Sequence, residues 1–184
     1  MAAEPILDLS KIDPSAVWLD RAAIARFNPH RGHMALLGAI AWHNEELSEG
    51  AAVVHVRPDA FWTSGHIPGN PIMPGVLMIE SGAQLASFLY YKRSGQDCFA
   101  GFTRIEEVAF RGQVVPGDTL LLLCKEVKYS VKRFITQIQG LVRGQIVFEG
   151  VITGMAFPNL GAVRREPIEA GVGSSRAPSG AARG

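Results

Sequence analysis

The chain has 184 residues, of which 47% are hydrophobic, and its formal net charge is +1. This length suits one domain with short tails, and the hydrophobic share excludes a mainly disordered chain. The near-neutral charge provides no field that would attract nucleic acid or an anionic membrane, so we expect neither nucleic-acid binding nor membrane insertion.

Residues 1–21 are expected to form an N-terminal extension, and they lack the basic-then-apolar pattern of a signal peptide. The Asp-Pro-Ser sequence at 13–15 is typical of a helix start, and the Asn-Pro pair at 28–29 would end that helix. The apolar residues predicted to lie on this helix are Val17, Trp18, Ala22, Ile24 and Ala25.

The longest apolar stretch is Ile72–Tyr91, which Pro74, Glu80 and Gln84 interrupt. We interpret it as a buried helix and not as a membrane span. A Pro-Gly pair marks its start, and two basic residues followed by a Ser-Gly pair mark its end. Apolar residues cover nearly its whole circumference, so a sheet or a second subunit must cover it on most sides.

Five segments rich in Val, Ile, Leu, Phe and Thr are predicted to be strands. They are Glu49–Val56, Phe99–Glu107, Thr119–Tyr129, Phe134–Arg143 and Ile146–Phe157. Short turns with Gly, Pro or Ser separate the later ones, which indicates an antiparallel meander. One apolar helix against one curved antiparallel sheet predicts an α+β fold with the sheet wrapped around a long central helix.

We expect this domain to occupy residues 22–160 and a disordered tail to occupy residues 161–184, whose end is rich in Gly, Ser, Ala and Arg. Cys98 and Cys124 are too few for a metal or disulfide framework and are expected to be small apolar residues. A reducing, cytoplasmic location is the expectation that follows.

The segment 65–75, which precedes the apolar helix, contains three prolines and three glycines and predicts a stiff loop. It ends where a helix begins, and the first N–H groups of a helix have no internal partner. Gly75 has no side chain to block approach to them. His66 lies at the loop entrance, and Glu80 lies in the helix among apolar neighbours, where a carboxylate is costly unless it is paired or functional.

These residues match the needs of dehydrating a 3-hydroxyacyl thioester. A neutral imidazole can take the C2 proton, and helix N–H groups can hold the developing oxyanion. A carboxyl group whose pKa is raised by burial can protonate the departing hydroxyl. Taken singly, His66 is better explained by an exposed or structural role, and Glu80 by pairing with an arginine.

The sequence GHIPGNPIMPGVLMIESGAQ, at residues 65–84, resembles the signature of the (3R)-hydroxyacyl-acyl-carrier-protein dehydratases of type II fatty acid synthesis. Residues 28–31 resemble the family's Pro-His-Arg segment, and Phe110 with residues 114–118 resembles its Val-Val-Pro-Gly-Asp turn. The similarity extends from about residue 22 to residue 157. Glutamate at position 80, where the isomerising branch has aspartate, favours the branch that only dehydrates.

The resemblance implies a hot-dog fold and the conversion of (3R)-hydroxyacyl-acyl carrier protein to the trans-2-enoyl thioester. It makes His66 the base and Glu80 the acid or water holder, contributed by different subunits of a homodimer or of a trimer of dimers. It also implies that the Gly75 N–H binds the thioester carbonyl, and that Gln84 supports Glu80 or lines the acyl tunnel. The other expected substrate-binding residues are Phe61, Trp62, Met73, Pro74 and Val76, although Phe61 and Trp62 could equally be ordinary core.

By the same resemblance the reaction needs no metal or dissolved cofactor, because the substrate arrives on the phosphopantetheine arm of an acyl carrier protein. Such carriers are acidic, so a basic patch should flank the site. Its candidates are Lys92, Arg93, Arg104, Arg111, Lys132 and Arg133. Two alternatives stay open, namely a hot-dog acyl-thioesterase and a non-catalytic protein that binds acyl thioesters.

Overall fold

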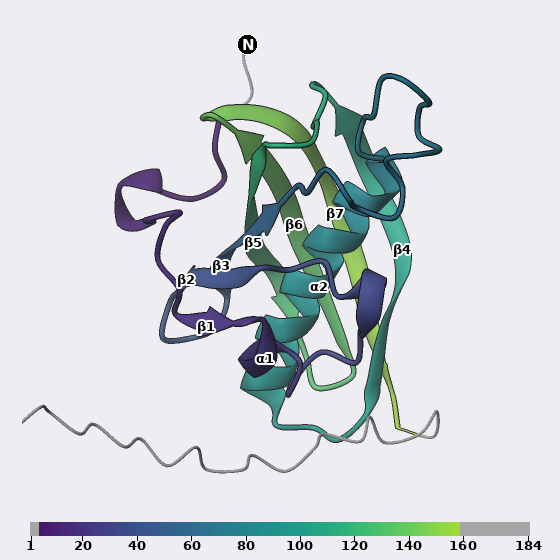
Figure 1. Ribbon diagram of the computed structural model, residues 1–184. Helices are drawn as coiled ribbons and strands as arrows, with labels where there is room; N and C mark the ends of the chain where they lie inside the picture. The colour runs from purple at the N-terminus through teal and green to yellow at the C-terminus, as the bar shows by residue number, and fades with distance from the viewer. Residues whose placement is uncertain (1–3, 159–184) are drawn as a thin grey trace, which may run out of the picture.

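The computed structural model describes residues 4–158, in which one long helix is wrapped by a seven-stranded antiparallel sheet (Figure 1). The strand order is β1-β2-β3-β5-β6-β7-β4. The strands are β1 (Leu19–Asp20), β2 (Ala39–His43), β3 (Glu49–His55), β4 (Phe99–Phe110), β5 (Thr119–Tyr129), β6 (Arg133–Val142) and β7 (Gln145–Phe157). The α-helices are α1 (Arg21–Ile24) and α2 (Gly75–Ser94), and the short 3-10 helices are η1 (Leu9–Lys11) and η2 (Gly32–Met34).

Helix α2 begins and ends where the sequence predicts. Pro74 precedes its first residue, and Gly95 ends it in the left-handed conformation, with φ of 60° and its N–H donated to the Tyr91 carbonyl. Most of its side chains are buried, and Phe88 is fully so. No helix within residues 4–158 is long and apolar enough to cross a membrane.

The sheet is covered on both faces, because alternate residues of a strand point to opposite sides. On β5, Leu122 packs in the main core with α2, whereas the next residue, Leu123, packs in a second cluster with Leu7 and Ile12 of the N-terminal extension. The side chain of Gln139 fixes this extension, since it accepts a hydrogen bond from the backbone N–H of Ile6 at 3.1 Å.

The predicted N-terminal helix is wrong in extent. Asp13 accepts a hydrogen bond from the Ser15 backbone at 2.8 Å, which closes a local turn and starts no helix. The helix starts only after Asp20, whose side chain accepts the Ala23 N–H at 2.8 Å, and it ends at Ile24. The two residues before it, Leu19–Asp20, form β1, and Trp18 is 62% exposed.

Among the described residues, strand β4 forms one edge of the sheet and pairs only with β7. It runs to Phe110, beyond the predicted end at Glu107, because the pairing resumes after an irregularity in which Glu107 has φ of 53°. Its exposed large apolar side chains include Phe102, Ile105 and Phe110. The loop between β3 and α2, which carries His66, lies at the upper right of the molecule, near this edge (Figure 1).

Candidate active site

The loop before α2 holds His66 through three hydrogen bonds. Its backbone N–H donates to the Trp62 carbonyl at 2.8 Å, and its carbonyl accepts the Ile72 N–H at 2.9 Å. Its ring Nδ1 lies 2.7 Å from the Ile72 carbonyl. Since a carbonyl can only accept, Nδ1 carries a hydrogen. In the neutral ring Nε2 is then the unprotonated nitrogen, which is what a general base requires.

The start of α2 leaves two backbone donors free. The Pro74 carbonyl accepts the N–H groups of Leu77 and Met78, at 2.9 and 3.3 Å. The N–H groups of Gly75 and Val76 make no hydrogen bond among residues 4–158. Val76 is also 70% exposed, so this helix end is accessible. Two unpaired N–H groups at an accessible helix N-terminus can bind an oxyanion.

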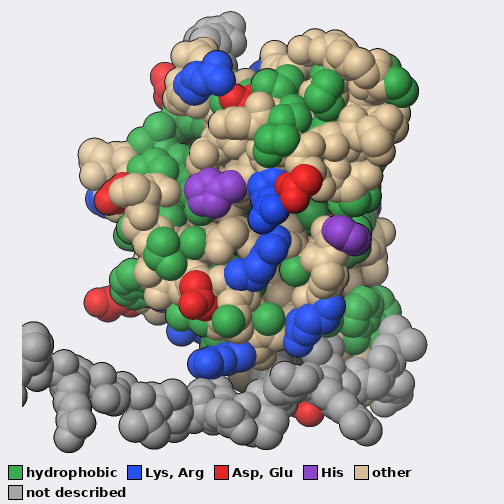
Figure 2. All heavy atoms as spheres, in the orientation of Figure 1, with side chains coloured by type: hydrophobic (Ala, Val, Ile, Leu, Met, Phe, Trp, Pro, Cys, Tyr) green, Lys and Arg blue, Asp and Glu red, His purple; other side chains and the backbone are tan. Residues whose placement is uncertain are grey.

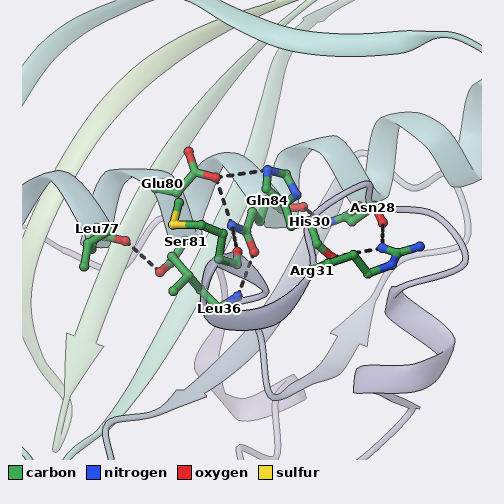
Figure 3. Close-up of polar contacts among 9 residues, drawn as sticks. Asn28, His30, Arg31, Leu36, Leu77, Glu80, Ser81 and Gln84 are labelled. Atoms are coloured by element: carbon green, nitrogen blue, oxygen red, sulfur yellow. Dashed lines mark hydrogen bonds and ion pairs between the residues drawn. The ribbon is translucent and has the colours of Figure 1, made fainter. Parts of the chain in front are cut away.

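Glu80 lies on the second turn of α2 with one carboxyl oxygen engaged and the other free (Figure 3). Oε1 accepts from Nε2 of Gln84 at 2.9 Å and lies 3.1 Å from Nε2 of His30. Its side chain is only 17% exposed. Oε2 makes no hydrogen bond within the described residues, so it can serve a ligand.

Gln84 connects Glu80 to the segment that precedes β2. Its Nε2 also donates to the Met34 carbonyl at 2.8 Å, and its Oε1 accepts the Leu36 N–H at 3.1 Å. Its own carbonyl accepts from the Asn28 side chain at 2.8 Å. Every polar group of the Gln84 side chain is therefore used, which fixes the orientation of the amide toward Glu80.

The expectation that burial raises the pKa of Glu80 is wrong for the single chain. Burial is the largest effect and does raise the pKa. The hydrogen bonds from His30 and Gln84, with the charge of His30, favour the carboxylate and together outweigh burial. The pKa of Glu80 is therefore lowered from its ordinary value of 4.5.

His66 and Glu80 share no hydrogen bond or ion pair within residues 4–158. The His66 hydrogen bonds stay within its own loop, whereas the Glu80 partners are His30 and Gln84. The single chain thus forms two separate clusters. One contains Glu80 and Gln84, and the other contains His66 and the loop that leads into Gly75.

Three of the expected substrate-binding residues line one hollow of about 260 Å³. Trp62 and Met73 are buried, and Phe61 is 46% exposed at its rim. Since the Trp62 carbonyl accepts the His66 N–H, this wall is continuous with the His66 loop. The polar side chains around the hollow are those of Arg21, His33, His55, Arg57 and Asp59.

The six basic residues proposed to receive a carrier are not equally available. Arg93 pairs with Glu126 at 2.7 Å, Arg104 pairs with Glu106 at 2.9 Å, and Arg111 pairs with Glu149. Lys92 lies over the Phe27 ring, 5.6 Å from its centre. Half of the expected patch is thus already neutralised by neighbouring carboxylates.

His30 is the functional candidate to which the sequence assigned no role. It belongs to the Pro-His-Arg segment at 28–31. Because His30 and Glu80 lie far apart in the sequence, no local sequence pattern predicts their contact. Residues 4–158 contain no group of three or more His, Cys, Asp or Glu side chains that could hold a metal ion.

Comparison with known proteins identifies the class. The model of the FabA-like domain family matches residues 28–151. The chain is 34% identical over 148 residues to a 3-hydroxyacyl-[acyl-carrier-protein] dehydratase FabZ of Nitratidesulfovibrio vulgaris, covering 77% of this chain and 94% of the relative. A relative of the same name in Acetivibrio thermocellus is 33% identical over 137 residues, covering 73% and 92%.

Solved structures agree on the fold. The dehydratase heterocomplex ApeI:P from Xenorhabdus doucetiae superposes with a TM-score of 0.63 at 18% identity, covering 74% of this chain and 91% of that one. Cj0977 from Campylobacter jejuni superposes with a TM-score of 0.58 at 15% identity, covering 79% and 95%. The predicted hot-dog fold is confirmed. The chain belongs to the FabA-like domain family, and within it to the 3-hydroxyacyl-acyl-carrier-protein dehydratases of the FabZ type.

Proposed function

We propose that the protein dehydrates (3R)-hydroxyacyl-acyl carrier protein to the trans-2-enoyl thioester in fatty acid biosynthesis. Besides family membership, one structural observation supports this proposed reaction. The chain presents an imidazole with Nε2 available, two free N–H groups at a helix start, and a carboxyl group with Oε2 available. Dehydration needs a base, an oxyanion site and an acid, and these are the three groups.

In the proposed reaction, Nε2 of His66 takes the C2 proton, and the electron pair of that C–H bond forms the C2=C3 double bond. The N–H groups of Gly75 and Val76 stabilise the negative charge that develops on the thioester oxygen. The C3–O bond breaks, and the departing oxygen takes a proton from Oε2 of Glu80 to leave as water; the lowered pKa makes Glu80 a stronger acid that is less often protonated. Exchange with solvent then removes the proton from His66 and returns one to Glu80.

We propose that His66 and Glu80 of one site come from two subunits of a homodimer. Support comes from the absence of any hydrogen bond or ion pair between them within residues 4–158 and from the edge strand β4. An unpaired edge with the exposed side chains of Phe102, Ile105 and Phe110 is costly in a lone subunit. A second copy that pairs along β4 would cover this edge and bring the two His66 loops toward the neighbouring helices.

We propose that the acyl carrier protein docks on the face in Figure 2, where several Lys and Arg side chains lie together. Arg21 and Arg57 line the hollow next to the His66 loop, but Arg57 is paired with Asp59 at 2.6 Å. The guanidinium of Arg21 donates to backbone carbonyls and makes no ion pair within residues 4–158, so its charge is available to an acidic partner. We place the protein in the cytoplasm, in keeping with Cys98 and Cys124, which are buried and unpaired.

The test is an assay with crotonyl-coenzyme A, in which hydration removes the enoyl absorbance and hydrolysis releases a free thiol. We expect hydration without thiol release. His66→Ala and Glu80→Gln should each lower kcat by roughly 10²–10⁴-fold, because each removes one acid/base group. His43→Gln and Glu126→Gln are matched controls away from the site and should keep wild-type rates. Thiol release, or near-normal hydration by either site variant, would contradict the proposal.

A further inference from the structure

His30 contacts Glu80 from outside helix α2 (Figure 3). Its Nε2 lies 3.1 Å from Oε1 of Glu80, and its side chain is 28% exposed. Its other ring nitrogen, Nδ1, is buried and has no hydrogen-bond partner within residues 4–158. Buried polar atoms are normally paired, and His30 Nδ1 is one of four buried side-chain atoms among the described residues that are not. Within the same residues, the one polar contact that the His30 ring makes is with the carboxyl group of Glu80.

The hydrogen bonds of Gln84 indicate which atom is the donor in the contact between His30 and Glu80. Both hydrogens on Nε2 of Gln84 are used, one on Glu80 and one on the Met34 carbonyl. With Glu80 ionised, Nε2 of His30 is the second donor to Oε1. The two donors hold Oε1 in place and leave Oε2 as the oxygen without a partner.

We propose that His30 is a positioning residue for Glu80. The His30 ring holds Oε1 of Glu80 so that Oε2 faces the departing hydroxyl group. The same hydrogen bond stabilises the carboxylate that remains once Glu80 has lost its proton. This inference rests on the proposed function. When the C3–O bond breaks, the hydroxyl oxygen takes the proton from Oε2. The negative charge left on Glu80 is then shared with the N–H groups of His30 and Gln84, which are already in place and need no reorganisation.

The other charged or titratable groups near this pair do not compete with His30. The guanidinium groups of Arg21 and Arg31 donate to backbone carbonyls and form no ion pair with Glu80. On β5, the Cys124 thiol donates to a carbonyl of α2, and burial raises its pKa, so it stays neutral. In the proposed dimer, His66 of the second subunit would be the remaining titratable group opposite Glu80.

The test is the pH dependence of crotonyl-coenzyme A hydration by the full-length protein. In this direction Glu80 must be a carboxylate to accept a proton from water, so kcat rises as the pH rises through its pKa. His30→Phe removes a donor to the carboxylate, and the acidic limb of the profile should move to higher pH. Its plateau kcat should also fall by about 10-fold or more, because Oε2 is no longer held in line. His30→Gln keeps a donor at similar reach and should retain the wild-type limb.

His43→Gln serves as the control, because His43 is the other half-buried imidazole and lies on β2, away from Glu80. The inference would be overturned if a folded His30→Phe protein kept both the wild-type acidic limb of the pH profile and the wild-type plateau kcat. If His30→Phe does not fold, His30→Asn, a donor too short to reach Oε1, is compared with His30→Gln, and identical limbs would overturn it. Full hydration by Glu80→Gln would instead defeat the proposed function itself, so the two failures are distinguishable.

Discussion

Gly75 lies so close to the ring of Phe110 that a Cβ at position 75 would be 2.7 Å from two ring carbons. The helix start is therefore packed directly against the edge strand β4. Because Phe110 is 52% exposed, its ring has room to move when Gly75 is changed, but only by disturbing the edge at which we place the second subunit.

We expect Gly75→Ala to lower kcat/KM by at least ~10-fold, since the added methyl group both displaces Phe110 and crowds the helix N–H groups. The double variant Gly75→Ala/Phe110→Ala separates these effects. It relieves the packing conflict, and its activity should remain below that of Phe110→Ala alone, which controls for the loss of the ring at the edge. Recovery of full activity in the double variant would show that the helix N–H groups do not bind the thioester oxygen.

The lowered pKa of Glu80 predicts a pH dependence of stability. A carboxyl whose folded pKa lies below its unfolded value stabilises the fold above the unfolded pKa, and this stability is lost as the pH falls through the folded pKa. The free energy of unfolding of wild type, relative to Glu80→Gln, should therefore decrease as the pH is lowered from 6 to below about 4. Urea titrations at several pH values measure this. A difference that grows toward low pH would contradict the assigned shift.

The close approach of β7 to the core gives a prediction of stability alone. A Cβ at Gly154 would lie 2.0 Å from the ring of Phe134, which is buried and stacked on Tyr90 at 4.7 Å. Gly154→Ala should cost about 1–3 kcal/mol, as expected for overpacking a core. Thermal unfolding measures it, with Gly65→Ala as a contrast, because nothing lies within 4 Å of its Cβ position and its φ is not positive. Equal losses in both variants would show that the Phe134 contact is not the cause.

The N-terminal extension is predicted to stabilise the sheet. The Gln139 side chain accepts the Ile6 N–H and donates to the Glu4 carbonyl, both at 3.1 Å. Gln139→Leu should lower the free energy of unfolding by about 1–3 kcal/mol, since it leaves partly buried backbone groups unpaired. It should leave kcat unchanged, because the extension packs on the face of the sheet away from α2. A loss of activity at unchanged stability would contradict this assignment.

Local patterns predicted helix α2 and the later strands well. The Pro-Gly start and the Gly95 stop act through backbone conformation, and the strand turns do likewise, so each can be inferred from a few adjacent residues. The N-terminal helix failed because Asp13 and Asp20 are both good helix caps, and only packing decides which one is used. Strand β2 was not predicted, because its five residues include two alanines, which do not favour strands, and its pairing with β3 forms it.

The site was predictable as a set of residues but not as an arrangement. The loop that carries His66 and the helix start at Gly75 are continuous in sequence, so both could be predicted from local patterns. The pKa of Glu80 depends on His30, which reaches it through tertiary packing, and no local pattern contains that contact.

The most direct test of the shared site mixes two inactive variants. His66→Ala and Glu80→Gln proteins are unfolded together and refolded as one mixture. If each site uses His66 of one subunit and Glu80 of the other, half of the dimers are mixed and each regains one intact site, so about a quarter of wild-type activity returns. Activity no higher than that of the two variants measured apart, in a mixture that contains mixed dimers, would contradict the account.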